Sequence, residues 1–317
     1  MKIRQFLRNW SLPIAMATGV VAYLLYARIP LSASAQDFVE DVISIAQPWL
    51  IFAMLFITFC KVRVKELRPS RWHVWLLIFQ IMAFMATSLL IAFLPGMPPS
   101  IRVMLEGVML CVLTPTATAA AVITARLGGN SASLVSYTIQ INIAVALVAP
   151  LFLSLSHPIE GMTLFESFLL IMAKVFPLLL CPLLCAELLR HLFPKVHRFI
   201  VSKGRNWPFY HWLVALTLAI AMTTRAIVQS NLSVWVMVGI AIVSLVCCIM
   251  QFALGRLVGK RYSDVIAAGQ SLGQKNTVFA IWFAYTFLTP VTAIAGGFYS
   301  IWHNLYNTWQ IYKHNHK

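Results

Sequence analysis

The sequence predicts an all-α polytopic membrane protein in which ten transmembrane helices form two inverted five-helix repeats. Three observations support this fold class. The chain of 317 residues is 60% hydrophobic and 10% charged, against about 25% charged residues in an ordinary soluble domain. Its apolar residues fall into ten long runs, and the fourth and ninth runs contain polar interruptions. A mean hydropathy of +0.82 excludes both a soluble globular chain and an intrinsically disordered one.

The ten runs have the length of membrane-spanning helices. An α-helical span needs about 20 mostly apolar residues, and only helices or closed barrels satisfy backbone polar groups in lipid. Barrel strands would be about half as long, with alternating polarity. The expected spans are 11–27, 42–59, 73–94, 103–125, 133–155, 164–187, 208–229, 232–255, 264–288 and 290–310.

The distribution of Lys and Arg predicts the orientation, because cytoplasmic loops carry an excess of both. One set of alternate segments holds 19 of them: Lys2, Arg4, Arg8, Lys61, Arg63, Lys65, Arg68, Arg71, Arg126, Arg190, Lys195, Arg198, Lys203, Arg205, Arg256, Lys260, Arg261, Lys313 and Lys317. The opposite set holds Arg28, Arg102 and Arg225. We expect an inner-membrane protein with both termini in the cytoplasm. The net charge of +15 then reflects orientation and contact with anionic lipids, and nucleic acid is not an expected partner.

The N-terminus also has features of a cleavable signal peptide: a basic start, an apolar stretch over 11–27 and the small residues Ala33, Ser34 and Ala35. The stretch is longer than the apolar region of most signal peptides, which has about 7 to 15 residues. Its removal would break the ten-span symmetry. We therefore expect the first span to be retained, with cleavage as the alternative.

The ten spans divide into two halves of five, 1–156 and 157–317, within one integral membrane domain. Because each half has an odd number of spans, the halves enter the membrane from opposite sides, as in many secondary transporters. In that plan the fourth helix of each half is discontinuous and the binding site lies near the midplane. The candidate site residues are Thr114, Pro115, Thr116 and Thr118 in the fourth span and Gln270, Ser271, Gly273, Gln274, Lys275, Asn276 and Thr277 in the ninth.

Lys275 is the most informative of these residues. A charge at the centre of a span costs about 3 kcal/mol or more, so intramembrane charges are functional candidates. The structural alternative is a lysine that braces the carbonyls and the C-terminal dipole of a broken helix. The two roles are compatible.

Five other polar residues within spans are supporting candidates: Gln80, Glu106, Gln140, Asn142 and Lys174. Glu106 and Lys174 are expected in the outer half of the membrane, where an ion pair, a transport role and snorkelling are the alternatives. The three amides would line a polar pathway or form interhelical hydrogen bonds.

Other chemistries find little support. Gly269, Ser271 and Gly273 match GxSxG, but a nucleophile elbow needs a strand, a turn and a helix, and here the match lies in an apolar helical run. The six cysteines lie in or beside apolar runs without CxxC spacing and are expected to pack as small residues. We expect no enzymatic activity, no cofactor and no metal site.

The two polar segments resemble the crossover motifs of the bile acid:sodium symporter family. The run 114–122 is similar to the family's Pro-Gly-Gly-Thr-Ala-Ser-Asn-Val motif, and the run 271–277 is similar to its Glu-Val-Gly-Met-Gln-Asn-Ser motif. The positions in step are Pro115, Thr118, Ala119 and Val122 in the first run, and Gly273, Asn276 and the conservative Thr277 in the second.

This resemblance implies a panel domain made of spans one, two, six and seven and a core domain made of the other six. It also implies that the two broken helices cross near the midplane and bind two sodium ions. Organic anions such as bile acids would bind beside the crossover. Movement of the core against the panel would expose them to either side.

The departures from the family pattern concern the sodium ligands. Ala120 and Ala121 stand where the family has Ser and Asn, Ser271 replaces its acidic ligand, and Lys275 replaces its glutamine ligand. Gln80 matches another amide ligand loosely. The loss of a carboxylate together with the gain of an ammonium predicts that neither sodium site remains. We therefore expect the Lys275 ammonium to take the place of a sodium ion.

The resulting expectation is a secondary active transporter of a small organic anion that works by alternating access without sodium, as a uniporter, an exchanger or, if Lys275 titrates, a proton-coupled carrier. The alternative is a non-transporting sensor or assembly protein that keeps the transporter fold. Such a protein has no need for polar residues along a pathway, so the retained polar residues at the two breaks favour transport.

Overall fold

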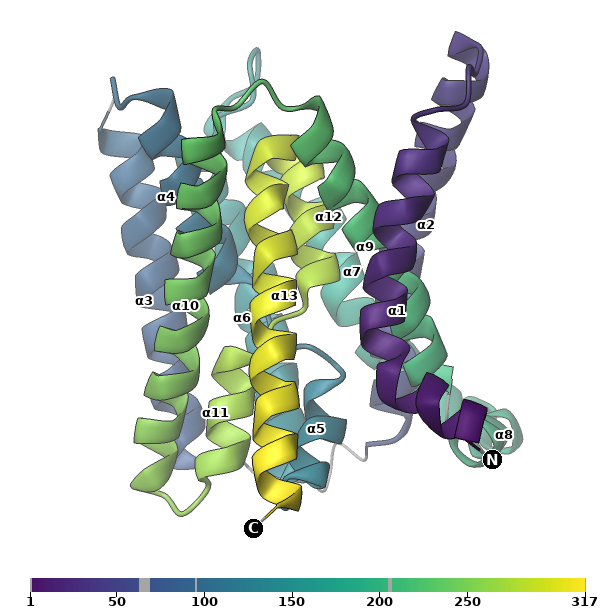
Figure 1. Cartoon of the computed structure of the whole chain (residues 1–317). Coiled ribbons are helices and arrows are strands. Elements are labelled where there is room, and N and C mark those ends of the chain that lie inside the picture. Colours follow the sequence, from purple (N-terminus) through teal and green to yellow (C-terminus); the bar gives the residue numbers. More distant parts are fainter. Residues whose placement is uncertain (1, 63–68, 95, 205–206, 317) are drawn as a thin grey trace.

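The described residues of the computed structural model, 2–62, 69–94, 96–204 and 207–316, form a bundle of helices (Figure 1). Side chains at 2–11, 203 and 208 lie outside this description. The helices are α1 (Lys2–Tyr26), α2 (Ala33–Cys60), α3 (Arg71–Phe93), α4 (Pro99–Leu113), α5 (Ala120–Arg126), α6 (Ser131–Ser156), α7 (Leu164–Leu192), α8 (Pro194–Lys203), α9 (Trp207–Gln229), α10 (Val234–Lys260), α11 (Val265–Gly273), α12 (Thr277–Phe287) and α13 (Pro290–Asn315).

Six helical segments within the described residues are long and apolar enough to cross a membrane: α2, α3, α6, α7, α10 and the part of α9 over Phe209–Gln229. The segment Leu12–Tyr26 of α1 and helix α12 are shorter apolar helices. The predicted all-helical class is therefore confirmed, and the length and composition of these helices are those of an integral membrane protein.

The second helix begins earlier than its apolar run, at Ala33 instead of residue 42. The hydroxyl of Ser32 caps it by accepting a hydrogen bond from the backbone N–H of Ala35 at 3.3 Å. Asp37 and Glu40 lie on the exposed first turns. Hydropathy alone misses such a polar extension, because an N-cap and the absence of a helix breaker set the true start.

Two segments are interrupted where the sequence predicts breaks. The first is split into α4 and α5 by residues 114–119, and the second into α11 and α12 by residues 274–276. Pro115 has no backbone N–H to continue α4. At the second break, a Cβ on Gly273 would lie 2.3 Å from the ring of Phe252, so only glycine fits at the end of α11.

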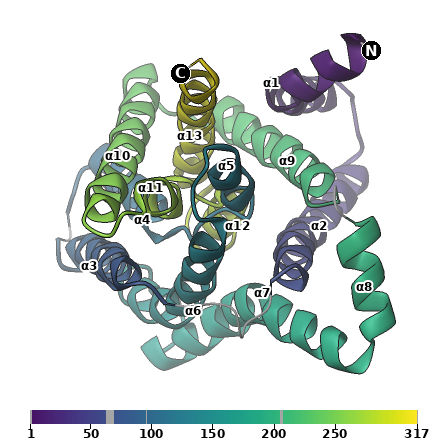
Figure 2. The same cartoon turned by 90° about the horizontal axis from the view of Figure 1, so that it is seen from below.

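The helices form two groups (Figure 2). In one group α1 packs against α9, and α2 packs against α7 and α9. In the other group α10 packs against α11, α4 and α13, and α3 packs against α4 and α6. Contacts of α6 with α7 and of α13 with α9 join the groups. Both termini lie at the same end of the bundle (Figure 1).

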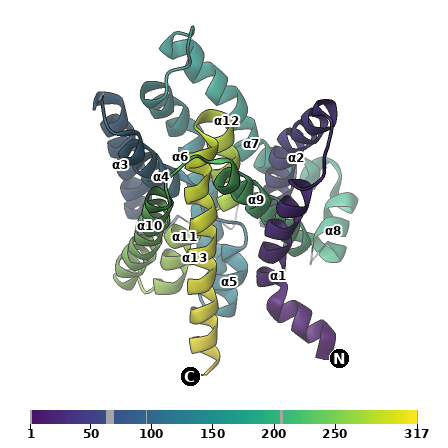
Figure 3. The same cartoon turned by 45° about the horizontal axis from the view of Figure 1, so that its top comes forward.

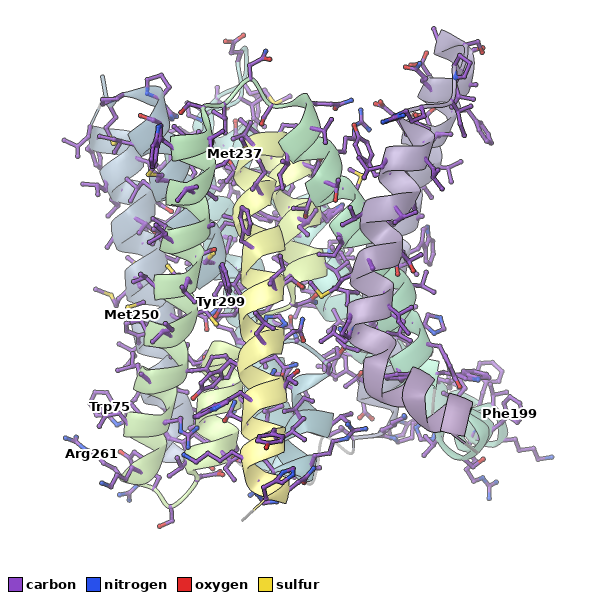
Figure 4. All side chains as sticks on the ribbon, in the orientation of Figure 1. Trp75, Phe199, Met237, Met250, Arg261 and Tyr299 are labelled. Carbon is purple, nitrogen blue, oxygen red and sulfur yellow. The ribbon has the colours of Figure 1, made fainter. Side chains whose placement is uncertain are left out.

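Basic residues gather at that end. Ten of the 19 predicted there have described side chains: Lys61, Arg71, Arg126, Arg190, Lys195, Arg198, Arg256, Lys260, Arg261 and Lys313. Arg261, labelled in Figure 4, marks this end of α10. The remaining nine fall outside the described side chains: Lys2, Arg4, Arg8, Arg63, Lys65, Arg68, Lys203, Arg205 and Lys317.

Candidate functional site

The two helix breaks pair with each other. The backbone N–H of Ala117 donates to the carbonyl of Gln274 at 2.9 Å, and the N–H of Asn276 donates to the carbonyl of Pro115 at 2.8 Å. Together they form an antiparallel bridge between Thr116 and Lys275. Extended backbone at this depth would be costly in lipid. Here each break supplies the hydrogen-bond partner of the other, and all the residues involved are buried.

Helix α4 ends in a set of carbonyls that receive side-chain donors. The amide nitrogen of Gln80 donates to the carbonyls of Leu113 and Thr114 at 3.3 and 3.0 Å. The hydroxyl of Tyr137 donates to the amide oxygen of Gln80 at 3.1 Å, which holds the amide in this orientation. A helix leaves its last four carbonyls without intrahelical partners, so Gln80 caps the end of α4 from the neighbouring α3.

Lys275 caps the same helix end. Its ammonium donates to the carbonyl of Val112 at 3.4 Å, and the residue is 1% exposed. The C-terminal end of a helix carries a partial negative charge that favours a cation. Glu106 and Lys275 are the only Asp, Glu, Lys or Arg residues that are buried in the described part of the chain. Lys275 therefore lies inside the paired breaks, and no buried carboxylate accompanies it there.

Gln251 of α10 is the third residue whose side chain caps the end of α4. Its amide nitrogen donates to the carbonyl of Cys111 at 3.3 Å and to the hydroxyl of Tyr299 at 3.1 Å. The Tyr299 hydroxyl in turn donates to the carbonyl of Gly273 at 2.8 Å, at the end of α11. This chain of hydrogen bonds joins α4, α10, α13 and α11 around the breaks.

The end of α11 has fewer capping side chains and several unpartnered ones. The hydroxyl of Thr116 donates to the carbonyl of Ser271 at 2.6 Å. The hydroxyl of Ser271 and the amide oxygens of Gln270 and Gln274 are buried without a hydrogen-bond partner among the described residues. Gln270 donates to the Asn307 amide oxygen at 2.8 Å, while the Asn307 amide nitrogen is also unpartnered. Buried polar groups normally have partners, so these atoms are the candidates at the breaks for contact with a polar ligand.

Two helix N-termini begin at the breaks. Helix α5 begins at Ala120 and helix α12 at Thr277. The amide oxygen of Asn276 caps α12 by accepting from the N–H of Phe279 at 3.3 Å. Thr118 and Thr277 are buried beside these starts. Because helix N-termini carry a partial positive charge, the breaks present this charge from both half-helices.

Glu106 does not pair with Lys174 as one alternative expected. Its carboxylate accepts from Arg102 and His157, each at 3.1 Å, and from the Thr292 hydroxyl at 2.7 Å. The ammonium of Lys174 is exposed and lies 5.9 Å from the centre of the Phe287 ring. Arg102 lies one turn before Glu106 on the same helix, so it is the closer cation. The i, i+4 spacing of the two residues could have indicated this pair from the sequence.

Gln140 and Asn142 lie away from the paired breaks. Gln140 makes hydrogen bonds to His73 at 3.1 Å and to Ser136 at 3.4 Å. Asn142 donates to the carbonyl of Thr138 in its own helix at 2.9 Å. The bond of Gln140 to His73 joins α6 to α3, and the amide oxygen of Asn142 is buried without a partner among the described residues. A pathway role for these two amides stays a prediction.

His73 belongs to a polar cluster where α3, α6 and α11 begin. The Trp72 indole donates to the Asp264 carboxylate at 3.1 Å across this cluster. Burial raises the pKa of the Asp264 carboxyl. A cavity of about 730 Å³ opens beside these residues, at the end of the bundle that holds the termini.

Sequence reasoning missed three residues of the site, Tyr137, Gln251 and Tyr299, together with Asn307. A signal was present for the last two. Tyr299, His303 and Asn307 follow each other at intervals of four residues, and so do Ser300 and Asn304. This spacing places a polar stripe on one face of a helix that is otherwise apolar.

The breaks lack the carboxylate that a sodium site would be expected to have, and the oxygens there that are unpartnered among the described residues, those of Ser271, Gln270 and Gln274, are neutral. Ala120 and Ala121 offer no side-chain oxygen, and the carboxylate of Glu106 is bound elsewhere by Arg102 and His157. Within the described residues, no group of three or more His, Cys, Asp or Glu side chains is placed to hold a metal ion. The carbonyl of Val112 at the end of α4 already receives the Lys275 ammonium.

No protein-family model matches the chain, and no curated protein matches it at a significant level.

Proposed function

We propose that the chain is a sodium-independent secondary transporter for a small organic anion, built on the plan of the bile acid:sodium symporters. The observation that carries the proposal is the pairing of two broken helices around a buried ammonium. In this plan the ten spans are α1, α2, α3, α4 with α5, α6, α7, α9, α10, α11 with α12, and α13. The panel is α1, α2, α7 and α9, and the remaining helices form the core.

The distribution of charge at the breaks supports an anionic substrate. The N-termini of α5 and α12 bring partial positive charge to the breaks, and the Lys275 ammonium adds a full charge nearby. Broken-helix transporters use half-helix N-termini to bind anionic groups in this way. The Ser271 hydroxyl and the Asn307 amide nitrogen, which have no partner among the described residues, supply hydrogen-bond donors beside the second break.

The two breaks support the inverted-repeat plan, because each half contributes one broken helix: α4 with α5 in 1–156 and α11 with α12 in 157–317. Gln80 and Gln251 each lie on the third span of their half and bond to a tyrosine of the fifth. Both glutamines cap the end of α4, so these two bonds are not equivalent under the repeat.

The basic end of the bundle supports the orientation that the sequence predicts. It carries both termini, so we place it in the cytoplasm of a cell whose inner membrane contains the protein.

Purified protein in liposomes tests the proposal directly. Uptake of labelled organic anions, from a panel of carboxylates and sulfonates, is compared in sodium and in choline buffers. We expect equal uptake in both buffers, and an absolute sodium requirement would contradict the proposal. Ligand-induced thermal stabilisation without uptake would instead support a sensor with this fold.

A matched pair of variants tests the role of Lys275. Lys275→Gln removes the ammonium but keeps a donor for the Val112 carbonyl, and we expect uptake to fall at least ten-fold. Lys174→Gln removes the other membrane lysine, which is exposed and lies beside the Phe287 ring, and we expect uptake to be unchanged. Wild-type uptake by Lys275→Gln would remove Lys275 from the mechanism.

A further inference from the structure

Helix α8 differs from every other long element in its direction. It runs across the bundle axis at the rim of the molecule, at the end that holds the basic residues (Figure 2, Figure 3). Phe193 is at once the C-cap of α7 and the N-cap of α8. Because α7 is long and apolar enough to cross a membrane, its end lies at the membrane surface, and α8 starts there.

Successive residues of a helix are rotated by about 100° around its axis. The side chains of α8 therefore lie on three different faces. Ile200 and His197 face the protein, and the Nε2 atom of His197 lies 2.8 Å from the carbonyl oxygen of Cys60 at the end of α2. Val196 and Phe199 lie on a second face and are 48% and 54% exposed. Figure 4 shows Phe199 at the outer edge of the molecule.

The third face is basic and has few partners. Lys195 and Arg198 are both exposed. Among the described residues Lys195 makes no hydrogen bond or ion pair, and Arg198 donates only to the carbonyl of Pro194 at 3.4 Å. An exposed apolar face beside an unpaired basic face is the pattern of a helix that lies in the membrane interface.

We propose that α8 is an in-plane helix that binds the phosphate groups of anionic phospholipids with Lys195 and Arg198 and inserts Val196 and Phe199 among their acyl chains. The charge of the basic face is complementary to such lipids. The apolar face continues the exposed apolar surface of α7, which includes Leu184 and Leu188.

The lipid contact acts on the rest of the fold through α2. Arg190 at the end of α7 donates to the carbonyls of Cys60 and Val62 at the end of α2, and His197 of α8 contacts the Cys60 carbonyl as well. Binding of α8 to the membrane surface therefore fixes the ends of α2 and α7 at one depth.

Native mass spectrometry of the full chain, in micelles containing equal amounts of phosphatidylcholine and phosphatidylglycerol, tests the proposal. We expect wild-type protein to retain phosphatidylglycerol preferentially. A basic residue at an anionic surface contributes about five-fold in affinity. Lys195→Gln with Arg198→Gln should therefore weaken retention about 25-fold.

The control is Lys260→Gln with Arg261→Gln, which removes the same charge at the same end from a membrane-crossing helix. It should weaken phosphatidylglycerol retention clearly less than the α8 double variant does, because these two residues do not lie on a helix with an exposed apolar face beside them in the membrane plane. An equal loss in both double variants, or no loss in either, would overturn the proposal. Glycerol phosphate is added to the wild type as a soluble competitor, and displacement of the lipid at millimolar concentration would show a free-phosphate site instead.

A measurement on the unmodified protein remains decisive if the α8 variants do not fold. Hydrogen exchange of the amides of residues 195–203 is followed in nanodiscs of phosphatidylcholine, with and without phosphatidylglycerol. We expect at least three-fold slower exchange with phosphatidylglycerol, and the difference should shrink in high salt because surface charge is screened. Identical exchange in the two lipids would contradict lipid binding by α8.

Discussion

The two helix breaks solve the same structural problem in different ways. The break after α4 covers residues 114–119, and its helix end is capped by side chains from three neighbours, Gln80, Gln251 and Lys275. The break after α11 covers only 274–276, and its helix end receives Thr116 and Tyr299. Three polar side-chain atoms beside the second break, on Gln270, Ser271 and Gln274, have no partner in the part of the chain that the structure describes.

This difference indicates that the two helix ends have different roles, one in holding the breaks together and one in contacting the substrate. Among the described residues, the caps at the end of α4 leave one buried side-chain atom unpartnered, the Gln251 amide oxygen, while the end of α11 leaves the Ser271 hydroxyl and the amide oxygens of Gln270 and Gln274. A more completely satisfied polar network is more rigid, because rearrangement leaves a buried group without a partner. Unpartnered buried polar atoms differ, because a ligand is able to bond to them without breaking an existing hydrogen bond of the protein. We therefore assign the end of α4 to holding the breaks in place and the end of α11 to contacting the substrate. The predictions below test this assignment in order of expected effect.

The largest effect is expected for Gly273→Val. Its Cβ would lie 2.3 Å from the Phe252 ring, and overpacking a tight core costs about 1–3 kcal/mol and occasionally more. We expect little folded protein, measured as the monodisperse fraction in size-exclusion chromatography. Pro115→Ala at the other break should lower stability by about 1 kcal/mol or less. Phe252→Ala should restore part of the loss, and normal yield of Gly273→Val alone would contradict the packing.

The second effect concerns the caps of α4. Gln80→Leu leaves two carbonyls and the Tyr137 hydroxyl without their partner, and an unsatisfied buried group costs about 1–3 kcal/mol. We expect a clearly lower midpoint of thermal unfolding in detergent, followed by tryptophan fluorescence. Gln140→Leu is the matched control, because Gln140 is half-buried and lies away from the breaks. If both variants unfold at the wild-type temperature, Gln80 does not support the break.

The positions of the breaks could be read from the sequence because their causes are local. Pro115 lacks an N–H, and the run from Gln270 to Thr277 is polar inside an apolar segment. Lys275 was recognised for the same reason, as a charge within a span. Each of these features is visible within a few residues of the chain.

The partners of these residues could not be read in the same way. The hydrogen bond from Gln251 to Cys111 joins residues 140 apart, and that from Tyr299 to Gly273 depends on how α13 packs. An isolated amide such as Gln251 has many acceptors within reach in an unpacked chain. Helix α8 was also missed, because a short basic segment after a span looks like a loop when hydropathy is the guide.

The third prediction compares two tyrosines. The Tyr299 hydroxyl donates to Gly273 and accepts from Gln251, whereas the Tyr137 hydroxyl donates only to Gln80. A typical hydrogen bond contributes about 1 kcal/mol, so Tyr299→Phe should destabilise about twice as much as Tyr137→Phe. Thermal unfolding of the two variants measures the ratio. Equal effects would mean that Tyr299 does not link the two breaks.

The smallest effect on stability, and the sharpest on function, is expected at the end of α11. The hydroxyl of Ser271 and the amide oxygen of Gln274 have no partner among the described residues. Removing them therefore breaks no internal hydrogen bond. It also removes a buried polar group whose desolvation destabilises the folded protein. Ser271→Ala and Gln274→Leu should unfold within about 0.5 kcal/mol of wild type, the range of substitutions that break no contact.

Uptake should nevertheless decrease in Ser271→Ala, because the Ser271 hydroxyl is able to donate to an anionic substrate. Loss of one hydrogen bond to a charged group corresponds to about 1.5–3 kcal/mol, so the apparent affinity for the anion should weaken roughly ten-fold or more in liposomes. The Gln274 amide oxygen only accepts hydrogen bonds, so Gln274→Leu should leave the affinity for an anion unchanged. Ser300→Ala offers a matched control, because its hydroxyl is also buried and unpartnered but lies on α13. Wild-type affinity in Ser271→Ala, with a loss in Ser300→Ala, would move the binding site from the second break to α13.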